Sequence, residues 1–367
     1  MKIVTIFNNK GGVGKTTLSF HLAHALGEMG KKVLMIDLDP QCNLTIYSLS
    51  MEDVHKVWAP EDAFIDDFQS ARNSISTQEF DRLVDDLRSV HFILKPTEDG
   101  TAELDQLPQP IELGKGVDLI PGRLTLHLYE AKVGERWSGV YQGDPLSIRT
   151  ATRIRSVARE YADRYGYDYV LFDTSPSLGA LNKSLLSLAD GFIIPCSPDL
   201  FSLYGIRNIG SALKTWRSQF ETIFHFLSDS KRSEFPSRFV EFLGYTIYNA
   251  KKYSGSGNSL NIAQAHFHYA ERIPETIETY IAESSRTKVG MPTLRKAIGG
   301  MSVIHTHNTL PSMAQKYTEP MWKLPSLIVE PEDRNTIMGN RKIYEDTKAA
   351  YIEFAEDFVR RAEALDD

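Results

Sequence analysis

Short apolar runs alternate with longer segments of helical periodicity along most of the chain. Lys2–Asn8 is rich in Ile, Val, Thr and Phe, as expected of a strand buried on both faces. A glycine-rich turn follows, and Lys15–Met29 then has the length and pattern of a helix that ends at Gly30. Lys32–Ile36 is a second apolar run. Strand, loop, helix and strand in this order form the βαβ pattern of a parallel sheet.

The same alternation continues toward the C-terminus, without an internal repeat. It predicts further strands at Val117–Ile120, Tyr169–Phe172, Phe192–Pro195 and Phe239–Tyr248, and helices at Ile148–Tyr165, Leu178–Leu188, Ala263–Glu283 and Tyr344–Ala364. We therefore expect an α/β fold with a doubly wound, mostly parallel sheet flanked by helices. Residues 1–367 are expected to form this single domain.

Segment 51–115 interrupts the alternation after the second strand. It holds 15 acidic and 6 basic side chains, a net charge of −9, which leaves 33 acidic and 35 basic side chains, or +2, elsewhere. Only one helix is evident in it, near Thr77–Val90. We expect an acidic insertion or lid on the α/β core, with a solvated excursion of no specific function as the alternative.

The composition is that of an ordinary globular protein, with 24% charged and 42% hydrophobic residues. The overall charge of −7 would argue against a protein that binds nucleic acid over its whole surface, but the acidity belongs to the insertion. Cys42 and Cys196 are too few and too far apart for a disulfide framework. The chain begins without a signal-peptide pattern, and no stretch approaches the ~20 apolar residues of a membrane span. These features predict a cytoplasmic location.

Between the first strand and the first helix lies the sequence Asn-Lys-Gly-Gly-Val-Gly-Lys-Thr-Thr, residues 9–17. Glycines let successive backbone N–H groups curl around phosphate oxygens, and the helix N-terminus adds its partial positive charge. In such a loop Lys15 reaches the β- and γ-phosphates, and the Thr16 hydroxyl ligates Mg²⁺. The motif predicts a nucleotide-binding loop formed by Lys10, Gly11, Gly12, Val13, Gly14, Lys15, Thr16 and Thr17.

This loop departs from the common Gly-x-x-x-x-Gly-Lys-Ser/Thr pattern, because Asn9 replaces the first glycine and a second lysine, Lys10, precedes Gly11. In this respect it resembles the deviant Walker A box of the ParA/Soj/MinD family of dimerising ATPases. The resemblance implies a P-loop NTPase fold with ATP and Mg²⁺ as cofactors. It also implies a homodimer formed with ATP, in which Lys10 contacts the nucleotide phosphates of the other subunit.

Carboxylates follow two of the predicted strands. Residues 37–41, Asp-Leu-Asp-Pro-Gln, resemble the family's second carboxylate motif, which makes Asp39 the residue that positions the attacking water. A carboxylate at this edge of the sheet can orient a water in line with the γ-phosphate. Asp37 is expected in the Mg²⁺ shell or in a loop contact. Asp173 ends a stretch that resembles Walker B and would hold Mg²⁺ through water. Residues 174–179 resemble the switch segment that follows.

Later stretches resemble the family with less specificity. An Asn at the end of the strand corresponding to 239–248 contacts the adenine in this family, so Asn249 is the candidate base contact. Residues 302–325 align loosely with the family's proline-containing adenine loop. They depart from it at Ile304-His305, where the family often has Ile-Pro, so we name no base contacts there.

Members of this superfamily differ in what they bind. Cys42 and Cys196 do not resemble the cysteine pair that holds a bridging iron–sulfur cluster. The C-terminal helix is acidic, which argues against binding to anionic membranes. Lys251 and Lys252 resemble a DNA-contacting basic site, and three cations at helical spacing could add phosphate contacts, namely Arg207, Lys214 and Arg217.

These features predict a ParA-type partition or positioning ATPase in the cytoplasm, associated with the nucleoid. It would dimerise with ATP, bind DNA non-specifically and be released when a ParB-like or adaptor protein stimulates hydrolysis, moving plasmid or chromosome DNA or a protein cargo. Lys10, Lys15 and Asp39 would be its catalytic residues. Two alternatives stay open. One is an ATP-dependent metabolic ligase or synthetase on the same fold. The other is a regulatory switch ATPase that acts through protein partners only, with the acidic insertion binding a basic partner.

Overall fold

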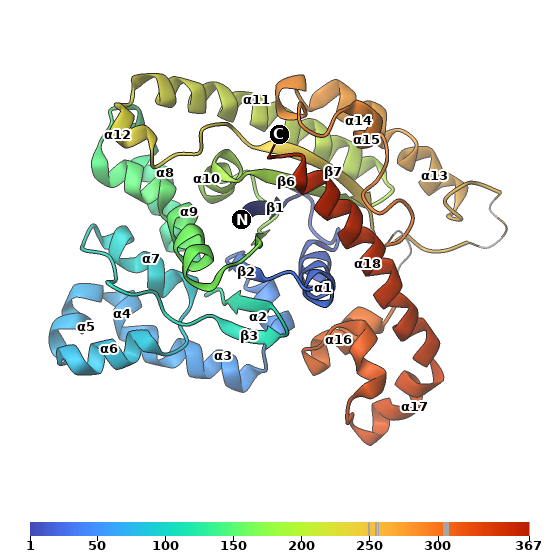
Figure 1. Ribbon diagram of the computed structural model, residues 1–367, viewed down its shortest axis with the longest axis horizontal. Coiled ribbons are helices and arrows are strands. Elements are labelled where there is room, and N and C mark those ends of the chain that lie inside the picture. The colour runs from blue at the N-terminus through green and yellow to red at the C-terminus, as the bar shows by residue number, and fades with distance from the viewer. Residues whose placement is uncertain (249, 254, 256, 304–307, 367) are drawn as a thin grey trace.

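The computed structural model describes residues 1–248, 250–253, 255, 257–303 and 308–366. A sheet of seven strands lies at its centre, in the order β3-β4-β2-β5-β1-β6-β7 (Figure 1). All neighbours are parallel except β3 and β4, which are antiparallel. The strands are β1 (Lys2–Ile6), β2 (Val33–Leu38), β3 (Ile111–Gly114), β4 (Val117–Ile120), β5 (Tyr169–Thr174), β6 (Gly191–Cys196) and β7 (Glu241–Ile247).

Helices cover both faces of the sheet, which confirms the doubly wound α/β fold. Outside segment 51–115 they are α1 (Lys15–Glu28), α2 (Asn43–Ser48), α8 (Leu126–Tyr141), α9 (Pro145–Tyr165), α10 (Ala180–Leu188), α11 (Leu200–Phe226), α12 (Asp229–Arg232), α13 (Gln264–Ala270), α14 (Ile273–Tyr280), α15 (Met291–Leu294), α16 (Leu310–Tyr317), α17 (Pro331–Gly339) and α18 (Arg341–Glu363). Short 3₁₀ helices lie at Ala59–Glu61, Glu283–Ser285 and Met321–Ser326.

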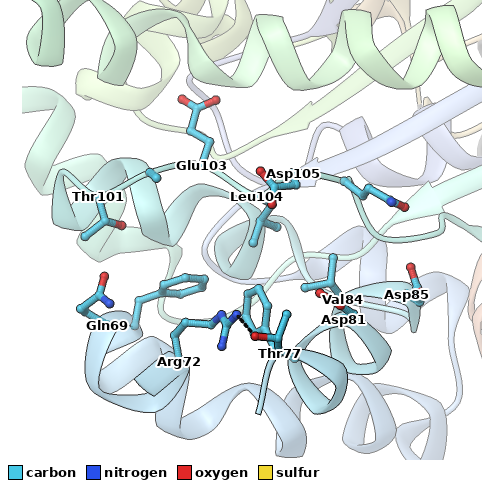
Figure 2. Close-up of a pocket in the computed structure, with 14 residues that line it drawn as sticks. Gln69, Arg72, Thr77, Asp81, Val84, Asp85, Thr101, Glu103, Leu104 and Asp105 are labelled. Atoms are coloured by element: carbon cyan, nitrogen blue, oxygen red, sulfur yellow. Dashed lines mark hydrogen bonds between the residues drawn. The ribbon is translucent and has the colours of Figure 1, made fainter. Parts of the chain in front are cut away.

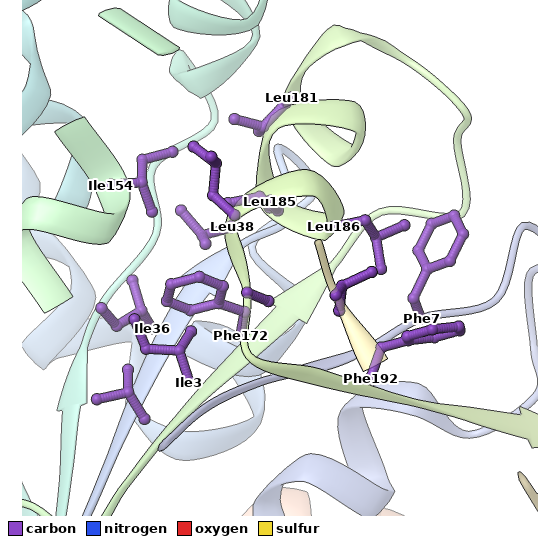
Figure 3. Packing of buried hydrophobic residues seen from close by; sticks show 14 of the residues in the cluster. Ile3, Phe7, Ile36, Leu38, Ile154, Phe172, Leu181, Leu185, Leu186 and Phe192 are labelled. Carbon is purple, nitrogen blue, oxygen red and sulfur yellow. The ribbon is translucent and has the colours of Figure 1, made fainter. Parts of the chain in front are cut away.

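The core has two halves because successive strand side chains point to opposite faces. Ile3 and Phe172 pack on one face against α10, where Leu185 and Leu186 are buried (Figure 3). The other face is covered by α1 and α18 and includes the neighbouring strand residue Val4. Both halves are apolar, so the sheet is held from both sides and its edge loops have fixed positions.

The predicted helix at Ala263–Glu283 is wrong, since two helices occupy this stretch. Helix α13 ends at Ala270, and α14 begins at Ile273 with Pro274 in its first turn. Proline has no backbone N–H and clashes with the preceding turn, so it starts a helix more readily than it continues one. The apolar periodicity across this stretch concealed the break.

Segment 51–115 is mainly helical, which its irregular pattern did not suggest. It contains α3 (Met51–Trp58), α4 (Asp62–Asp66), α5 (Phe68–Ser74), α6 (Thr77–Asp85) and α7 (Val90–Asp99), and then β3. The single helix expected at Thr77–Val90 is wrong, because α6 ends at Asp85 and Ser89 caps the start of α7. The boundaries 51–115 and the single-domain organisation stay predictions.

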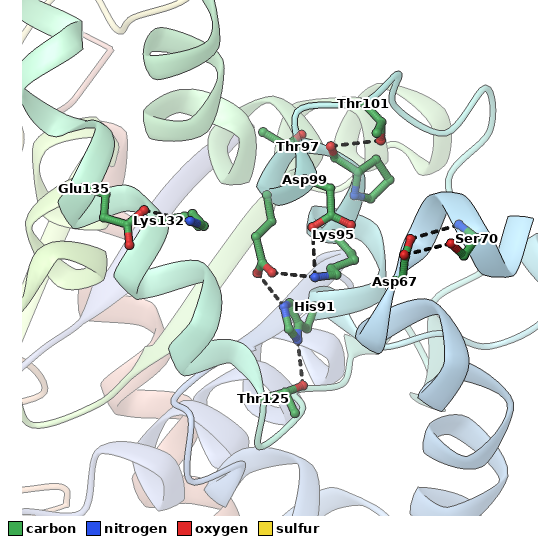
Figure 4. A network of polar contacts seen from close by, with 12 residues as sticks. Asp67, Ser70, His91, Lys95, Thr97, Asp99, Thr101, Thr125, Lys132 and Glu135 are labelled. Carbon is green, nitrogen blue, oxygen red and sulfur yellow. Dashed lines mark hydrogen bonds and ion pairs between the residues drawn. The ribbon is translucent and has the colours of Figure 1, made fainter.

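Helix α7 joins this segment to the main core. Phe92 packs with the aromatic cluster of α4 to α6, whereas Ile93 and Leu94 belong to the core under the sheet. The buried His91 shares a hydrogen bond between its Nδ1 and Thr125 Oγ1 at 2.7 Å (Figure 4). Arg136 of α8 donates to Thr97 O of α7 at 2.9 Å. The segment is therefore anchored by both apolar and polar contacts.

The C-terminal helix α18 docks on the core through its apolar side chains. Tyr351, Phe354 and Phe358 are fully buried against α1 and the sheet. Ile343, at the start of the same helix, is 53% exposed and does not join them. Across the described residues, no helix combines the length and the apolar character needed to cross a bilayer.

Candidate functional site

The glycine-rich loop between β1 and α1 adopts a conformation that its glycines make possible. Gly12 and Gly14 have φ angles of 73° and 79°, in the left-handed region that side chains with a Cβ rarely occupy. A Cβ on Gly14 would also lie 2.2 Å from ring carbons of Tyr248, just after β7. The loop is therefore packed closely against β7, with backbone N–H groups at the N-terminus of α1.

Lys15 opens α1 and is buried, with 8% of its surface exposed. Its Nζ donates to the carbonyl oxygens of Asn8 at 3.2 Å and Lys10 at 3.3 Å. Burial lowers the pKa of Lys15, while the carboxylates of Asp173 and Asp39 act in the opposite direction. The loop thus holds a cation where the sequence motif predicts one.

Thr16 and Asp173 are brought together, as predicted for a Mg²⁺ site. Asp173 lies at the end of β5 and accepts from Thr16 Oγ1 at 2.8 Å and from Ser19 Oγ at 3.0 Å. Burial raises the pKa of Asp173 above its usual range. The two oxygen groups are hard ligands of the kind that Mg²⁺ prefers. Mg²⁺ is commonly held by one or two such protein oxygens together with phosphate and water oxygens, so Thr16 and Asp173 fit the ion.

Asp37 faces Asp173 across neighbouring strands but has other partners. The two residues are in register between β2 and β5, and both are fully buried. Asp37 Oδ2 accepts from Thr45 N at 2.8 Å and from Thr45 Oγ1 at 2.6 Å, and Gly122 N donates to the same hydroxyl at 2.7 Å. Burial, and then the Asp173 charge, raise the pKa of Asp37 to about 8. These contacts match the loop role expected of Asp37, and its place in the Mg²⁺ shell stays a prediction.

Asp39 is fixed at the carboxyl end of β2. Its Oδ1 accepts from Gln41 N at 2.9 Å, and its Oδ2 accepts from Asn43 Nδ2 at 3.0 Å. Asp39 lines a cavity of about 390 Å³ together with the glycine-rich loop. Pro176, from the stretch 174–179 that resembles the switch segment, lines the same cavity. So do residues that the sequence did not single out: Asn43, Tyr47, Pro311, Ser312 and Gln315. The loose alignment of 302–325 with an adenine loop was the one signal for the last three.

Lys10 is engaged within its own chain. Its Nζ forms an ion pair with the carboxylate of Asp199 and lies 5.8 Å from the ring centroid of Phe201. Asp199 also caps α11, because its Oδ1 accepts from Ser202 N at 2.9 Å. Sequence reasoning missed Asp199. An Asp three residues before a Ser at the start of a long helix signals a cap, but not a contact with the phosphate loop.

The candidate DNA-binding residues are only partly brought together. Lys251 and Lys252 are exposed after β7, and Arg207 and Lys214 are exposed on α11. Arg217, in contrast, donates to Ser284 O at 2.7 Å and to Ser285 Oγ at 2.9 Å. The helical stripe of three cations is therefore reduced to two at the surface.

The remaining predicted positions are the candidate adenine contacts and the two cysteines. Asn249 lies outside the described residues, and so do Ile304 and His305. Cys42 and Cys196 are both buried free thiols. The structure therefore gives no position for the predicted adenine contact at Asn249, which stays a prediction.

Comparisons with known proteins agree with this geometry. The family model of the AAA domain matches residues 1–226. The sporulation initiation inhibitor protein Soj of Bacillus subtilis is 28% identical over 222 residues, covering 60% of this chain and 68% of Soj. The probable plasmid-partitioning protein ParA of Thermus thermophilus is 29% identical over 226 residues, covering 60% and 53%. The chain spans about half to two thirds of the length of the curated relatives it matches.

Solved structures extend the likeness in fold to nearly the whole chain. The structure of pNOB8 ParA has a TM-score of 0.55 and 21% identity, covering 99% of this chain and 98% of that one. This likeness concerns the fold, whereas the family assignment comes from the matched sequence and the phosphate loop. On these grounds the chain belongs to the ParA/MinD family of P-loop partition ATPases.

Proposed function

We propose that this chain is a ParA-type positioning ATPase that forms a dimer with ATP and Mg²⁺. It binds DNA non-specifically as a dimer and leaves the DNA when a ParB-like or adaptor protein stimulates hydrolysis. Its cargo is plasmid or chromosome DNA or a protein assembly, and it acts in the cytoplasm at the nucleoid. The proposal rests mainly on Lys10, a second lysine at the rim of an otherwise ordinary phosphate loop.

Different residues of the site bind the phosphates, position the attacking water and hold Mg²⁺. Lys15 and the loop N–H groups bind the phosphates, and Asp39, held by Gln41 and Asn43, orients the attacking water. Thr16 and Asp173 would hold Mg²⁺, which neutralises charge on the β- and γ-phosphates when bound. Phosphoryl transfer needs little more from a protein than such positioning and charge stabilisation.

The surface beside Lys10 supports dimerisation. Four large apolar side chains are 40% to 71% exposed near the phosphate loop and α11: Leu178, Leu200, Phe201 and Tyr204. Large apolar side chains exposed beside a functional site commonly mark a surface that a partner covers. A second copy bound there would bury them and bring its own Lys10 to the nucleotide.

DNA binding is supported by exposed cations and by one structural relative. Lys251 and Lys252 are exposed at the end of β7, and Arg207 and Lys214 are exposed on α11. A similar fold, pNOB8 ParA, has been solved bound to nonspecific DNA. Phosphate contacts of this kind weaken with rising salt.

The test uses the full chain with ATP, with ADP or without nucleotide. Light scattering should show a dimer only with ATP, and arbitrary duplex DNA should be retarded only in that state. ATP turnover that needs a small substrate and ignores DNA would instead indicate a ligase or synthetase. A dimer formed with ATP that never retains DNA would indicate a switch that acts through protein partners alone.

A further inference from the structure

A groove in the acidic segment is separate from the nucleotide site. It has a volume of about 650 Å³ and lies between α5 and α6 on one side and the loop 101–106 on the other (Figure 2). Its lining combines apolar side chains with four carboxylates. The apolar members are Phe68, Phe80, Val84 and Leu104, and the carboxylates are Asp81, Asp85, Glu103 and Asp105.

The apolar floor of the groove is built from packed aromatic rings. Phe68 and Phe80 have ring centroids 6.0 Å apart, and Phe68 lies 5.8 Å from Phe92 of α7. Phe64 packs edge-on against Phe68 at 5.5 Å and completes the cluster. Aromatic rings in these arrangements attract each other beyond their burial. These contacts form the floor of the groove from the chain's own side chains.

Three of the four carboxylates face the solvent without a cation. Glu103 is paired with Arg153 at 2.8 Å, but Asp81, Asp85 and Asp105 form no ion pair with any residue that the structure describes. Asp81 and Asp85 also stand one helical turn apart on α6, where like charges repel each other.

The one cation of the groove does not neutralise these carboxylates. The Arg72 guanidinium lies 4.4 Å from the ring centroid of Phe80 and donates to Thr77 Oγ1 at 3.3 Å. Figure 2 shows Arg72 and Thr77 beside each other, while Glu103 and Asp105 lie on the opposite wall. The negative charge thus comes from both walls and remains available to a ligand.

We propose that this groove binds a basic amphipathic segment of a partner protein. Lysines or arginines of that segment would pair with Asp81, Asp85 and Asp105, and its apolar side chains would lie on the floor between Phe80 and Leu104. Charge complementarity selects a basic occupant, since the whole segment carries −9. The aromatic floor selects one with apolar residues at positions i, i+3 or i+4, and i+7 on one face of a helix, as in helix-in-groove recognition.

The test measures binding of a labelled synthetic 14-residue peptide with Leu along one face of a helix and Lys along both edges of that face. Fluorescence anisotropy is followed with the full chain, without nucleotide, at about 150 mM salt. The groove variant Asp81→Lys/Asp85→Lys is compared with the matched control Glu52→Lys/Glu112→Lys. All four residues are exposed, and the control changes the same segment by the same charge outside the groove.

The proposal predicts at least tenfold weaker binding to the groove variant and a change of less than twofold in the control. Equal weakening in both would overturn it in favour of diffuse charge attraction. Equal binding of a peptide with Ser in place of Leu would overturn the role of the apolar floor. Self-association of the chain that the groove variant abolishes would show that a second copy, rather than another protein, is the occupant. Because no nucleotide is present, these outcomes are independent of the proposed ATPase function.

Discussion

Lys10 and Asp199 are 189 residues apart in sequence and form an ion pair at the rim of the phosphate loop. The lysine that is proposed to reach a second subunit is thus held within its own chain. Dimerisation by way of Lys10 has to break this pair, so Asp199 competes with the phosphates of the other subunit. The pair is partly exposed, so its own strength is modest.

Replacing Asp199 should therefore favour the dimer. We expect Asp199→Asn, which keeps an oxygen to cap α11, to lower the ATP concentration needed for half-maximal dimerisation by about twofold to fivefold. Lys10→Ala should instead weaken the dimer while leaving ATP bound. Light scattering during an ATP titration measures both, and an unchanged dimer in Lys10→Ala would refute the contact across subunits.

Replacing Asp39 should slow the hydrolysis of ATP without preventing its binding. Asp39→Ala removes the carboxylate that Gln41 and Asn43 hold, so we expect ATP to bind and its hydrolysis to slow by at least tenfold. Phosphate release and equilibrium binding of a fluorescent ATP analogue measure the two steps. Glu112→Gln, at an exposed site on β3, is the control. Normal turnover in Asp39→Ala would remove this residue from the water-positioning role.

Lys251 and Lys252 should matter for DNA but not for ATP. The double variant Lys251→Glu/Lys252→Glu reverses two exposed charges, and we expect at least tenfold weaker DNA retention in the presence of ATP. The slope of affinity against salt should also fall. Arg334→Glu/Lys342→Glu, which reverses two exposed charges on α17 and α18, is the matched control. A salt profile like that of the unmodified chain would exclude this site.

Stability of the nucleotide-free protein should depend on Asp37. Its folded-state pKa is raised to about 8 by burial and by Asp173, so the folded chain holds its proton more tightly than the unfolded chain does. The stabilisation is complete below the ordinary pKa of the carboxyl group and is lost as the pH rises through about 8. We expect the Tm to fall between pH 6 and pH 9, by about 3 °C or more.

Asp37→Asn should flatten this fall, because the amide cannot ionise and still offers an oxygen to Thr45. Differential scanning fluorimetry across the pH range measures the effect. Glu112→Gln should leave the profile unchanged, since that carboxylate is exposed. A fall as steep in Asp37→Asn as in the unmodified chain would contradict the assignment.

Much of the fold was predictable because its signals are local. The strand at Val117–Ile120 has the predicted bounds, since an apolar run between turns leaves little alternative. The helix expected at Ala263–Glu283 failed at Pro274, where apolar periodicity and proline geometry conflict. The short helices of the acidic segment were hidden for a related reason, because each is too short to repeat its pattern.

The candidate site also contains some residues that a local motif predicts and others that it does not. Lys15 and Thr16 follow from a contiguous motif, and the structure places Thr16 beside Asp173. Thr45, in contrast, reaches Asp37 only because a helical turn folds back over the strand end. Asp199 meets Lys10 only through the packing of β6 beside β1. Contacts between distant residues need the tertiary fold, and a single sequence does not display it.

The packing of Tyr248 on Gly14 also determines when the phosphate loop gains its support during synthesis of the chain. Tyr248 supports the phosphate loop, and its hydroxyl is hydrogen-bonded to that of Tyr351 at 2.9 Å, deep inside α18. A ribosome makes the glycine-rich loop before it makes α18. A nascent chain therefore carries the phosphate-binding residues before Tyr248 and Tyr351 are present to support them, and nucleotide binding awaits synthesis of α18.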